Sequence, residues 1–293
     1  MIANLIRAEG YSKQASFGVA FGGILNIILD PLFIFGFHLE IAGATMLSAW
    51  AATLYFLSFM YRKRKNIVIS LSPKHYTLKK SVSIRIIVTG LPNFLISFFA
   101  TISDTVLNPL VAVYSNEALA GLGIAKKIDM LVFAIAQGVT QGTLPLVSYS
   151  YASGNRDRMV KLIRATVLYG LLFALSGMSL LLLGAAPLSR LFIADAATTS
   201  YSKYFTRVIA LTCPTTTLTL LTISVFQATE RKVPPLIIST LRKGSLDIPL
   251  MFLLNHLFQL RGLVWAVPLA DLGALIVAVI MFVPYIKKLQ NTL

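Results

Sequence analysis

Long apolar stretches without charged side chains recur along the chain and predict its main elements. Four of them contain no Asp, Glu, Lys or Arg, namely residues 41–61, 130–155, 165–189 and 208–229. A helix needs roughly 20 apolar residues to cross a hydrocarbon core about 30 Å thick, and each of these stretches is long enough. We therefore expect four membrane-spanning helices at these positions.

Four further apolar stretches are interrupted by charged residues. They are residues 16–37 around Asp30, 86–114 around Asp104, 233–257 around Arg242, Lys243 and Asp247, and 262–285 around Asp271. Their length and composition still favour spanning helices. The pattern thus predicts an all-α, polytopic membrane protein with about eight transmembrane helices.

Composition and charge agree with a membrane protein. Hydrophobic residues make up 56% of the 293 residues and charged residues 13%, about half the share of roughly 25% in soluble domains. The net charge of +15 would fit a nucleic-acid partner in a soluble protein. Most of the 26 Lys and Arg instead fall in alternate loops, as expected for cytoplasmic loops. We expect a multi-pass protein of the cell (cytoplasmic) membrane, with both termini cytoplasmic, membrane lipid as its surroundings and no nucleic-acid partner.

The residues that enzymes and metal sites need are sparse. The chain has three His that are far apart, a single Cys213, no His-Glu-x-x-His motif and no Walker-type glycine loop. We expect neither an enzyme nor a metal site, and no ATP-driven activity.

An internal repeat links the two ends of the chain. Residues 29–31, Leu-Asp-Pro, resemble residues 246–249, Leu-Asp-Ile-Pro, and similar short matches recur at separations of 217 to 220 residues. The first two spans then correspond to the last two, so the repeat unit has six helices and both copies share one orientation. This predicts that four helices of the first copy lie upstream of Met1. The alternative is an eight-helix protein with a chance similarity.

Three motifs resemble the multidrug and toxic compound extrusion (MATE) family. Residues 22–35, Gly-Gly-Ile-Leu-Asn-Ile-Ile-Leu-Asp-Pro-Leu-Phe-Ile-Phe, are similar to its fifth helix, and the Ala-Gly-Ala-Thr of residues 42–45 to the start of its sixth. Residues 138–149, Gly-Val-Thr-Gln-Gly-Thr-Leu-Pro-Leu-Val-Ser-Tyr, are similar to its eighth helix, and Gly90-Leu91-Pro92 with Asn108 to its seventh. The resemblance implies helices 5 to 12 of a twelve-helix fold made of two parallel six-helix repeats. Residues 1–61 would end the N-terminal lobe, 62–83 would form a basic cytoplasmic interlobe loop, and 84–293 would form the C-terminal lobe.

The resemblance also implies a function. Family members are antiporters that export organic cations or other amphiphiles in exchange for protons or sodium, with no other cofactor. Ala100 stands where some bacterial members carry a coupling Glu, and the first helix, which holds a coupling Asp in another branch, is not in this chain. Two alternatives stay open. One is a lipid-linked saccharide flippase, which would favour an Arg-rich cavity, and the other is an inactive fragment or one that depends on a partner, the missing N-terminal helices.

Asp104 is the first candidate for binding the substrate or the coupling ion. Eighteen uncharged residues precede it and twelve follow, and Asn108 lies four residues later on the same helix face. A carboxylate at membrane depth is retained mainly where it faces a cavity or a partner. The alternative is a structural pairing of Asp104 with Lys126 or Lys127.

Other polar residues within the spans are weaker candidates. Gln141 could contact substrate or hydrogen-bond across helices, and Asp271, with no cation near it in sequence, could bind an ion or a neighbouring helix. Asp129 follows Lys127 closely, which favours an interfacial ion pair. We expect structural or gating roles for the remaining positions: Asp30 and Pro31 at a helix end, Gly138, Gly142 and Pro145 for close packing and a bend, and Asp247 in an intrahelical ion pair with Lys243.

Overall fold

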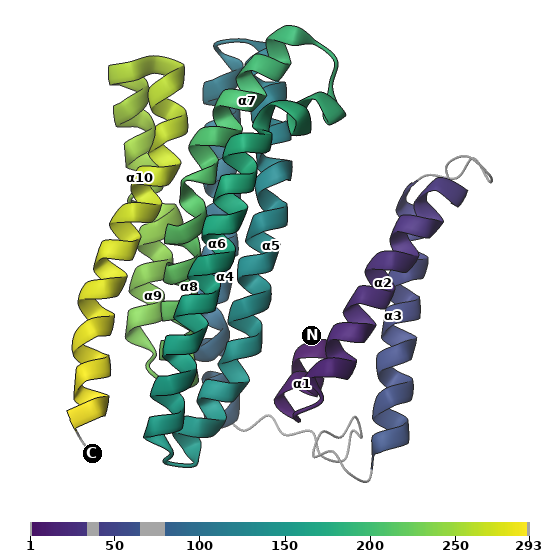
Figure 1. Ribbon diagram of the computed structural model, residues 1–293, viewed down its shortest axis with the longest axis vertical. Helices are drawn as coiled ribbons and strands as arrows, with labels where there is room; N and C mark the ends of the chain where they lie inside the picture. Colours follow the sequence, from purple (N-terminus) through teal and green to yellow (C-terminus); the bar gives the residue numbers. More distant parts are fainter. Residues whose placement is uncertain (1, 34–40, 65–79, 292–293) are drawn as a thin grey trace. The chain divides into compact units, whose positions relative to one another are not determined.

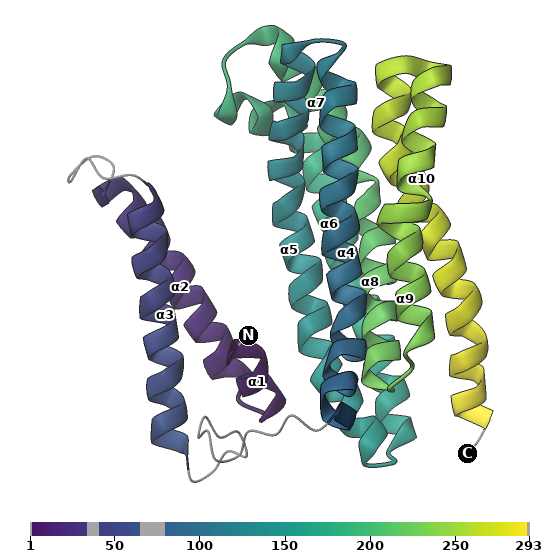
Figure 2. The same ribbon diagram turned by 180° about the vertical axis from the view of Figure 1, so that it is seen from behind.

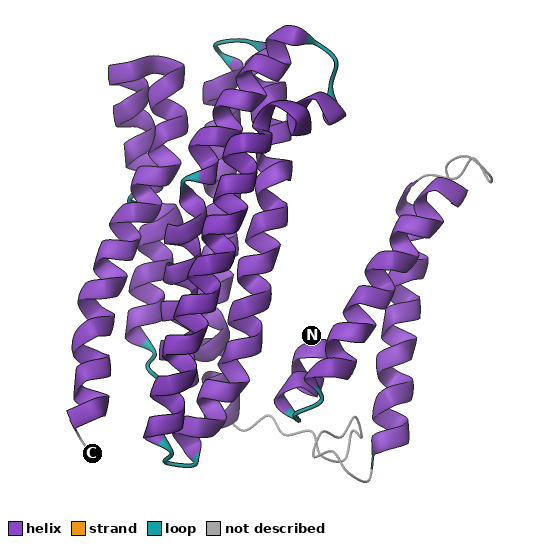
Figure 3. Ribbon diagram, viewed as in Figure 1, coloured by secondary structure: helices purple, strands orange, loops and turns teal. Residues whose placement is uncertain are grey.

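A computed structural model describes residues 2–33, 41–64 and 80–291 of the chain, and the regular structure in these ranges is entirely helical (Figure 3). The chain forms two compact units, Met1–Lys79 and Lys80–Leu293. Most of the expected basic interlobe loop, residues 65–79, lies outside the described residues.

The first unit holds three helices, α1 (Ile2–Ala8), α2 (Ser12–Pro31) and α3 (Ile41–Lys63) (Figure 1). Gly10 has a φ of 88° in the turn between α1 and α2, a conformation that glycine adopts without strain. α2 packs along α3, where Gly18 lies against the rings of Tyr55 and Phe56. These helices contain the first two expected spans within the described residues.

The second unit begins with three long helices, α4 (Lys80–Ala112), α5 (Asn116–Ala152) and α6 (Arg156–Phe192). Side chains that are good N-caps mark where helices begin. The Ser115 and Asn155 side chains each accept a hydrogen bond of 3.0 Å from the backbone N–H three residues on, and so open α5 and α6. The tight turns place neighbouring helices antiparallel, as the two opposite views show (Figures 1 and 2).

The remaining helices of the second unit combine into longer rods. α7 (Ala196–Ala210) continues into α8 (Thr212–Ala228), and α9 (Val233–Thr240) continues through the π-helical turn η3 (Leu241–Ser245) into α10 (Asp247–Asn291). Gln259 interrupts α10 with a φ of 54° and a ψ of −141°, and the chain folds back there (Figure 1). α10 therefore has a first limb up to Phe258 and a second limb from Leu260, and the second unit supplies the six spans that the pattern predicts.

Four helical stretches among the described residues are long and apolar enough, by length and composition, to cross a membrane. They are Gly90–Ala112, Arg156–Phe192, Ala196–Ala228 and Val233–Leu289, and the last contains both limbs of α10. The helices α2, α3 and α5 also have spanning lengths, of 20, 23 and 37 residues, but are not among these four.

The core of the second unit is built around α8. Its apolar side chains Leu220, Ile223 and Phe226 are buried against residues of α4, α5, α9 and α10. α8 is also rich in threonine, and most of these hydroxyls bond the backbone carbonyl one turn earlier in the helix. Thr219 and Thr222 do so at 2.7 and 2.9 Å. Such bonds satisfy a buried hydroxyl within its own helix. α8 can therefore lie at the centre of the unit although it contains many polar side chains.

Candidate functional site: a cavity beside buried charges

A cavity of about 360 Å³ lies within the second unit, between α4, α5, α7, α8, η3 and α10. Much of its wall is apolar and includes Ile96, Leu107, Leu122, Met130 and Phe133. Six charged residues also line it: Asp104, Lys126, Asp129, Arg242, Lys243 and Asp271. Apolar walls with a few polar groups are typical of small-molecule sites, so this cavity is the candidate functional site.

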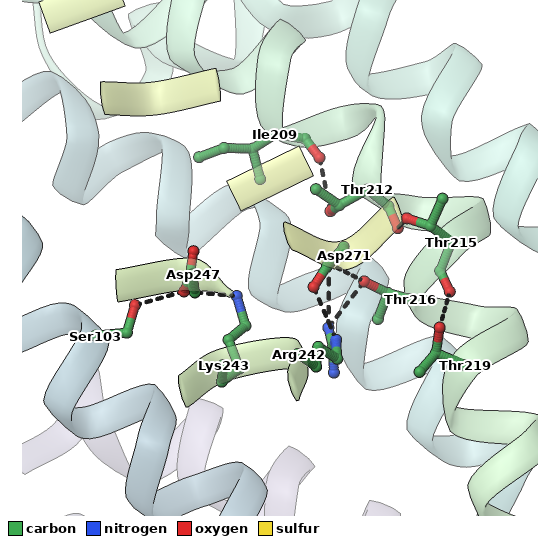
Figure 4. A network of polar contacts seen from close by, with 10 residues as sticks. All are labelled: Ser103, Ile209, Thr212, Thr215, Thr216, Thr219, Arg242, Lys243, Asp247 and Asp271. Atoms are coloured by element: carbon green, nitrogen blue, oxygen red, sulfur yellow. Dashed lines mark hydrogen bonds and ion pairs between the residues drawn. The ribbon is translucent and has the colours of Figure 1, made fainter. Parts of the chain in front are cut away.

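A fully buried ion pair forms one wall of the cavity (Figure 4). Arg242, on η3, donates from Nε to Oδ1 of Asp271 on the second limb of α10 at 2.9 Å. Thr216 of α8 donates to the other carboxylate oxygen at 2.7 Å and accepts from Arg242 Nη2 at 2.8 Å. The Arg242 and Asp271 side chains are only 4% and 2% exposed. Three separate rods are thereby joined by one network of charge-assisted hydrogen bonds.

The next residue of η3 reaches a second carboxylate. Lys243 Nζ lies 3.9 Å from Oδ2 of Asp247, and Ser103 of α4 donates to that same oxygen at 2.7 Å (Figure 4). The ion pair expected from the spacing of Lys243 and Asp247 is therefore present, and it is tied to another helix. Gly244 allows α4 to come this close, because a Cβ atom there would be 2.9 Å from the ring of Phe99.

Asp104 lines the cavity and is also paired. Lys126 of α5 donates from Nζ to Asp104 Oδ1 at 2.7 Å and to Asn108 Oδ1 at 3.3 Å. The shared cation shows that Asp104 and Asn108 lie on one face of α4. Asp104 therefore lies in the cavity wall, as a binding role requires, and it is also paired with Lys126 across the turn to α5, as a structural role requires. The pair is solvent-accessible, with the Lys126 and Asp104 side chains 30% and 57% exposed.

Asp129 differs from the other cavity carboxylates. The expected interfacial pair with Lys127 is not formed: within the described residues Asp129 has no ion pair and no hydrogen bond, and it lines the cavity instead. The physical reason is helical geometry, because residues two apart on a helix do not face each other. The charges that act on Asp129 are those of Lys243, Asp271 and Arg242.

The charges in and beside the cavity do not balance. The carboxylates are Asp104, Asp129, Asp247 and Asp271, and the cations are Lys126, Arg242 and Lys243. Each cation is used by one of the three ion pairs. With all groups ionised one negative charge is left over, and Asp129 is the carboxylate without a pair. Asp129 is half-buried, and an unpaired charge at membrane depth is costly unless a cation or a proton neutralises it.

The remaining predicted residues lie away from this cavity. Gln141 is half-buried on α5 and is not part of the cavity wall. Within the second unit a Cβ atom at Gly138 or Gly142 would meet nothing within 4 Å, so close packing at these glycines stays a prediction. α5 continues as a helix through Pro145.

Asp30 and Pro31 are the last two residues of α2, which agrees with a helix end at this point. Their side chains lie outside the described residues.

Sequence reasoning missed Asp129, Lys126 and Thr216 as parts of one site. It also assigned no partner to Arg242, which the structure pairs with Asp271, 29 residues further along the chain. One signal was available: a carboxylate and a guanidinium in neighbouring apolar spans each require a partner at membrane depth. Thr216 gave no signal, because it is one of several threonines in α8 whose hydroxyls look equivalent in sequence.

Comparison with known proteins places these features in a family. The MatE family model matches residues 92–253. The chain is 29% identical over 297 residues to the multidrug export protein MepA of Staphylococcus haemolyticus (strain JCSC1435), covering 100% of this chain and 64% of that protein. It is 30% identical over 275 residues to MepA of Staphylococcus aureus (strain N315), covering 92% of this chain and 60% of that protein.

Solved structures show the same fold. A crystal structure of MATE in the bent conformation superposes with a TM-score of 0.82 at 22% identity, covering 98% of this chain and 64% of that one. A MOP superfamily transporter from Pyrococcus furiosus Vc1 (DSM3638) gives a TM-score of 0.86 at 19% identity, covering 97% and 65%. The chain therefore spans slightly less than two thirds of the length of these relatives. Because the family model matches more than half of its residues, the chain belongs to the MatE family of membrane transporters, which are not enzymes.

Proposed function

We propose that the protein is a secondary active antiporter that exports organic cations, drugs or other amphiphiles by alternating access, in exchange for protons or sodium. The observation that carries the proposal is the uncompensated negative charge of Asp129 in the wall of an otherwise largely apolar cavity. The apolar wall suits the hydrophobic part of an amphiphile, and the surplus charge suits a single cation.

The same surplus charge gives a mechanism for exchange. A proton or a sodium ion on Asp129 would neutralise the cavity, and a cationic substrate would neutralise it equally well. Because only one of them is needed for charge balance, each would lower the affinity for the other, which is the thermodynamic requirement for antiport. Asp104 and Asn108 would contact the substrate near the exposed side of the cavity. Asp271 would act indirectly, by holding Arg242 away from Asp129.

The decisive comparison is between Asp129→Asn and Asp195→Asn. Asp195 caps α7 outside the cavity, and Asn is an equally good cap, so this control removes one carboxylate and keeps the fold. Ethidium efflux should be measured over a range of external pH in cells that lack their own export pumps. Asp129→Asn should lose most of the efflux and its dependence on pH, whereas Asp195→Asn should keep both. Efflux by Asp129→Asn with an unchanged rate and pH profile would reject the role of Asp129.

The length of the chain relative to its relatives requires a second arm. The assay should be run with the 293-residue chain and with a fusion in which the N-terminal helices of Staphylococcus haemolyticus MepA precede it. Efflux by the chain alone would reject the interpretation as an inactive or partner-dependent fragment. Efflux by the fusion alone would support that interpretation. Ethidium binding to the purified chain, measured by fluorescence, tests the cavity in either case and should weaken in Asp129→Asn.

A lipid-linked saccharide flippase is the second candidate, and one observation favours it. Lys126, Arg242 and Lys243 line the cavity, and a pyrophosphate would bind to such cations. All three are engaged in ion pairs, however, which leaves the excess charge negative. Inorganic pyrophosphate that displaces ethidium from the purified chain would favour the flippase.

We also propose an orientation in which both termini are cytoplasmic. It is supported by the basic residues at one end of the second unit, which include Arg158, Lys161, Arg231 and Lys287. Labelling with a membrane-impermeant thiol reagent tests this in intact cells. Lys161→Cys, near the start of α6, should be protected from the reagent. Ser115→Cys, at the start of α5, should be labelled. The reverse pattern would overturn the orientation.

A further inference from the structure

An open groove of about 320 Å³ lies on the outside of the second unit, between the beginning of α6 and the end of α10. Its wall is apolar apart from one residue. The lining from α6 is Val160, Ile163, Arg164, Val167, Leu168 and Leu171, and α10 adds Phe282 and Ile286. Arg164 is thus the single charged side chain of the groove, and it is exposed.

Arg164 belongs to a row of cations on α6. Arg158, Lys161 and Arg164 follow one another at intervals of three residues, which places them on one helix face, and all three are exposed. Arg158 and Lys161 line a second depression on α6, together with Asp157, the one acid in the sequence of that helix. Among the described residues neither Lys161 nor Arg164 has an ion pair or a hydrogen-bonded partner. These two cations are therefore available to an external anion.

The groove lies at a depth where lipid headgroups and acyl chains meet. Arg164 is eight residues from the start of α6, about 12 Å at 1.5 Å per residue. The beginning of α6 and the end of α10 lie at the same end of the unit (Figure 1). From Arg164 the apolar wall continues along α6 to Leu171, roughly 10 Å further. A ligand of this groove would need an anionic head and an apolar tail that point in these two directions.

We propose that this groove binds an anionic phospholipid, with the phosphate between Lys161 and Arg164 and one acyl chain along Val167, Leu171 and Phe282. Charge complementarity identifies the occupant: Arg164 is the one charged residue of the groove, the exposed Lys161 lies one turn before it on α6, and the rest of the groove wall is apolar. Basic pockets between transmembrane helices bind acidic headgroups for this reason. The site is separate from the cavity around Asp129, with which it shares no residue.

The test is native mass spectrometry of the purified 293-residue chain with phosphatidylglycerol and, separately, phosphatidylcholine. Phosphatidylglycerol should bind more tightly. Arg164→Gln should weaken phosphatidylglycerol binding about fivefold, which corresponds to about 1 kcal/mol for one cation near the membrane surface. Arg164→Lys keeps the charge and should retain most of the affinity. Arg190→Gln, at the other end of the same helix, removes an equally exposed cation and should have little effect.

The outcomes separate the possible explanations. Equal binding of the two lipids would overturn the proposal, because the headgroup charge would then not be recognised. Equal losses in Arg164→Gln and Arg190→Gln would also overturn it, since the effect would reflect net charge alone. Unfolding is controlled by the thermal midpoint, which should be the same for all three variants because both arginines are exposed. Efflux is not the readout, so failure here leaves the proposed transport function untouched.

Discussion

Replacing Asp271 with Leu tests whether the buried network holds the second unit together. Asp271 and Arg242 are 2.9 Å apart and almost completely buried, and Thr216 bonds both of them. Leu has a similar size but no charge, so the guanidinium of Arg242 would lose its counter-ion. No second carboxylate in the described structure forms an ion pair with that guanidinium, Asp129 included, and Arg242 Nη1 already lacks a hydrogen-bond partner. The variant should therefore be strongly destabilised.

The magnitude follows from the burial. Removing one partner of a buried ion pair costs about 3 to 5 kcal/mol, because an uncompensated charge remains. For a unit of this size each kcal/mol lowers the thermal midpoint by about 2 to 4 °C. We expect a decrease of roughly 6 to 20 °C for Asp271→Leu in detergent, measured by tryptophan fluorescence. Lys126→Gln is the matched control: its pair is exposed, such pairs contribute about 0 to 1 kcal/mol, and the midpoint should fall by no more than about 4 °C.

A double variant distinguishes an unpaired charge from a packing defect. In Arg242→Met with Asp271→Leu both charges are gone, and apolar replacements of buried pairs are often neutral or stabilising. The double variant should therefore unfold at a higher temperature than Asp271→Leu alone. Two results would refute the reasoning. One is an Asp271→Leu variant whose thermal midpoint is no lower than that of Lys126→Gln. The other is a double variant whose midpoint falls by the sum of the decreases in the single variants Arg242→Met and Asp271→Leu.

Three further predictions concern the helices around the cavity. Gly121→Ala should cost about 1 to 3 kcal/mol of unfolding free energy, because its Cβ atom would lie 2.8 Å from α7. Gly142→Ala should be neutral or stabilising by up to about 1 kcal/mol, because its Cβ atom would meet nothing within 4 Å. Thermal unfolding of both variants tests this, and equal midpoints would contradict it. Thr216→Val should cost about 1 to 3 kcal/mol in the same assay, since it removes a hydroxyl that serves both charges. The backbone N–H of Thr198 lowers the pKa of Asp195, so Asp195→Ala should be less stable than the parent above pH ~4, and the difference should shrink as the pH falls through the lowered pKa; a difference that stays constant between pH 2 and 7 would exclude the cap charge as its cause.

The spans could be predicted from the sequence because lipid imposes a simple requirement. Each crossing needs roughly 20 residues that are mostly apolar, and the chain shows this pattern directly. The helix starts could also be predicted locally, since Ser115 and Asn155 are preferred N-caps followed by apolar runs. The break inside α10 lies between the spans predicted at residues 233–257 and 262–285. The positive φ of Gln259 had no signal in the sequence, because this residue is not glycine.

The partners of the buried charges could not be predicted in the same way. Hydropathy gives the limits of a helix but not its rotation, and α8 is buried around most of its circumference, so no polar face indicates which threonine meets Asp271. The π-helical turn is a second irregularity that the sequence does not indicate. Within it Arg242 forms an ion pair with Asp271 and Lys243 forms one with Asp247, whereas the spacing of a regular helix indicated only the second pair.

Charge counting across spans would have identified the site more directly than motif matching. The charged residues within the second unit's apolar helices are few, and each needs neutralisation at membrane depth. Asp104, Asp129, Asp247 and Asp271 outnumber Lys126, Arg242 and Lys243 by one, so one of these carboxylates is left without an ion pair whichever pairs form. The structure adds the identity of that carboxylate. Ala100, at the position where the family resemblance implies a coupling Glu in some members, is also in the cavity wall, whereas the unpaired carboxylate of this cavity is on α5, at Asp129.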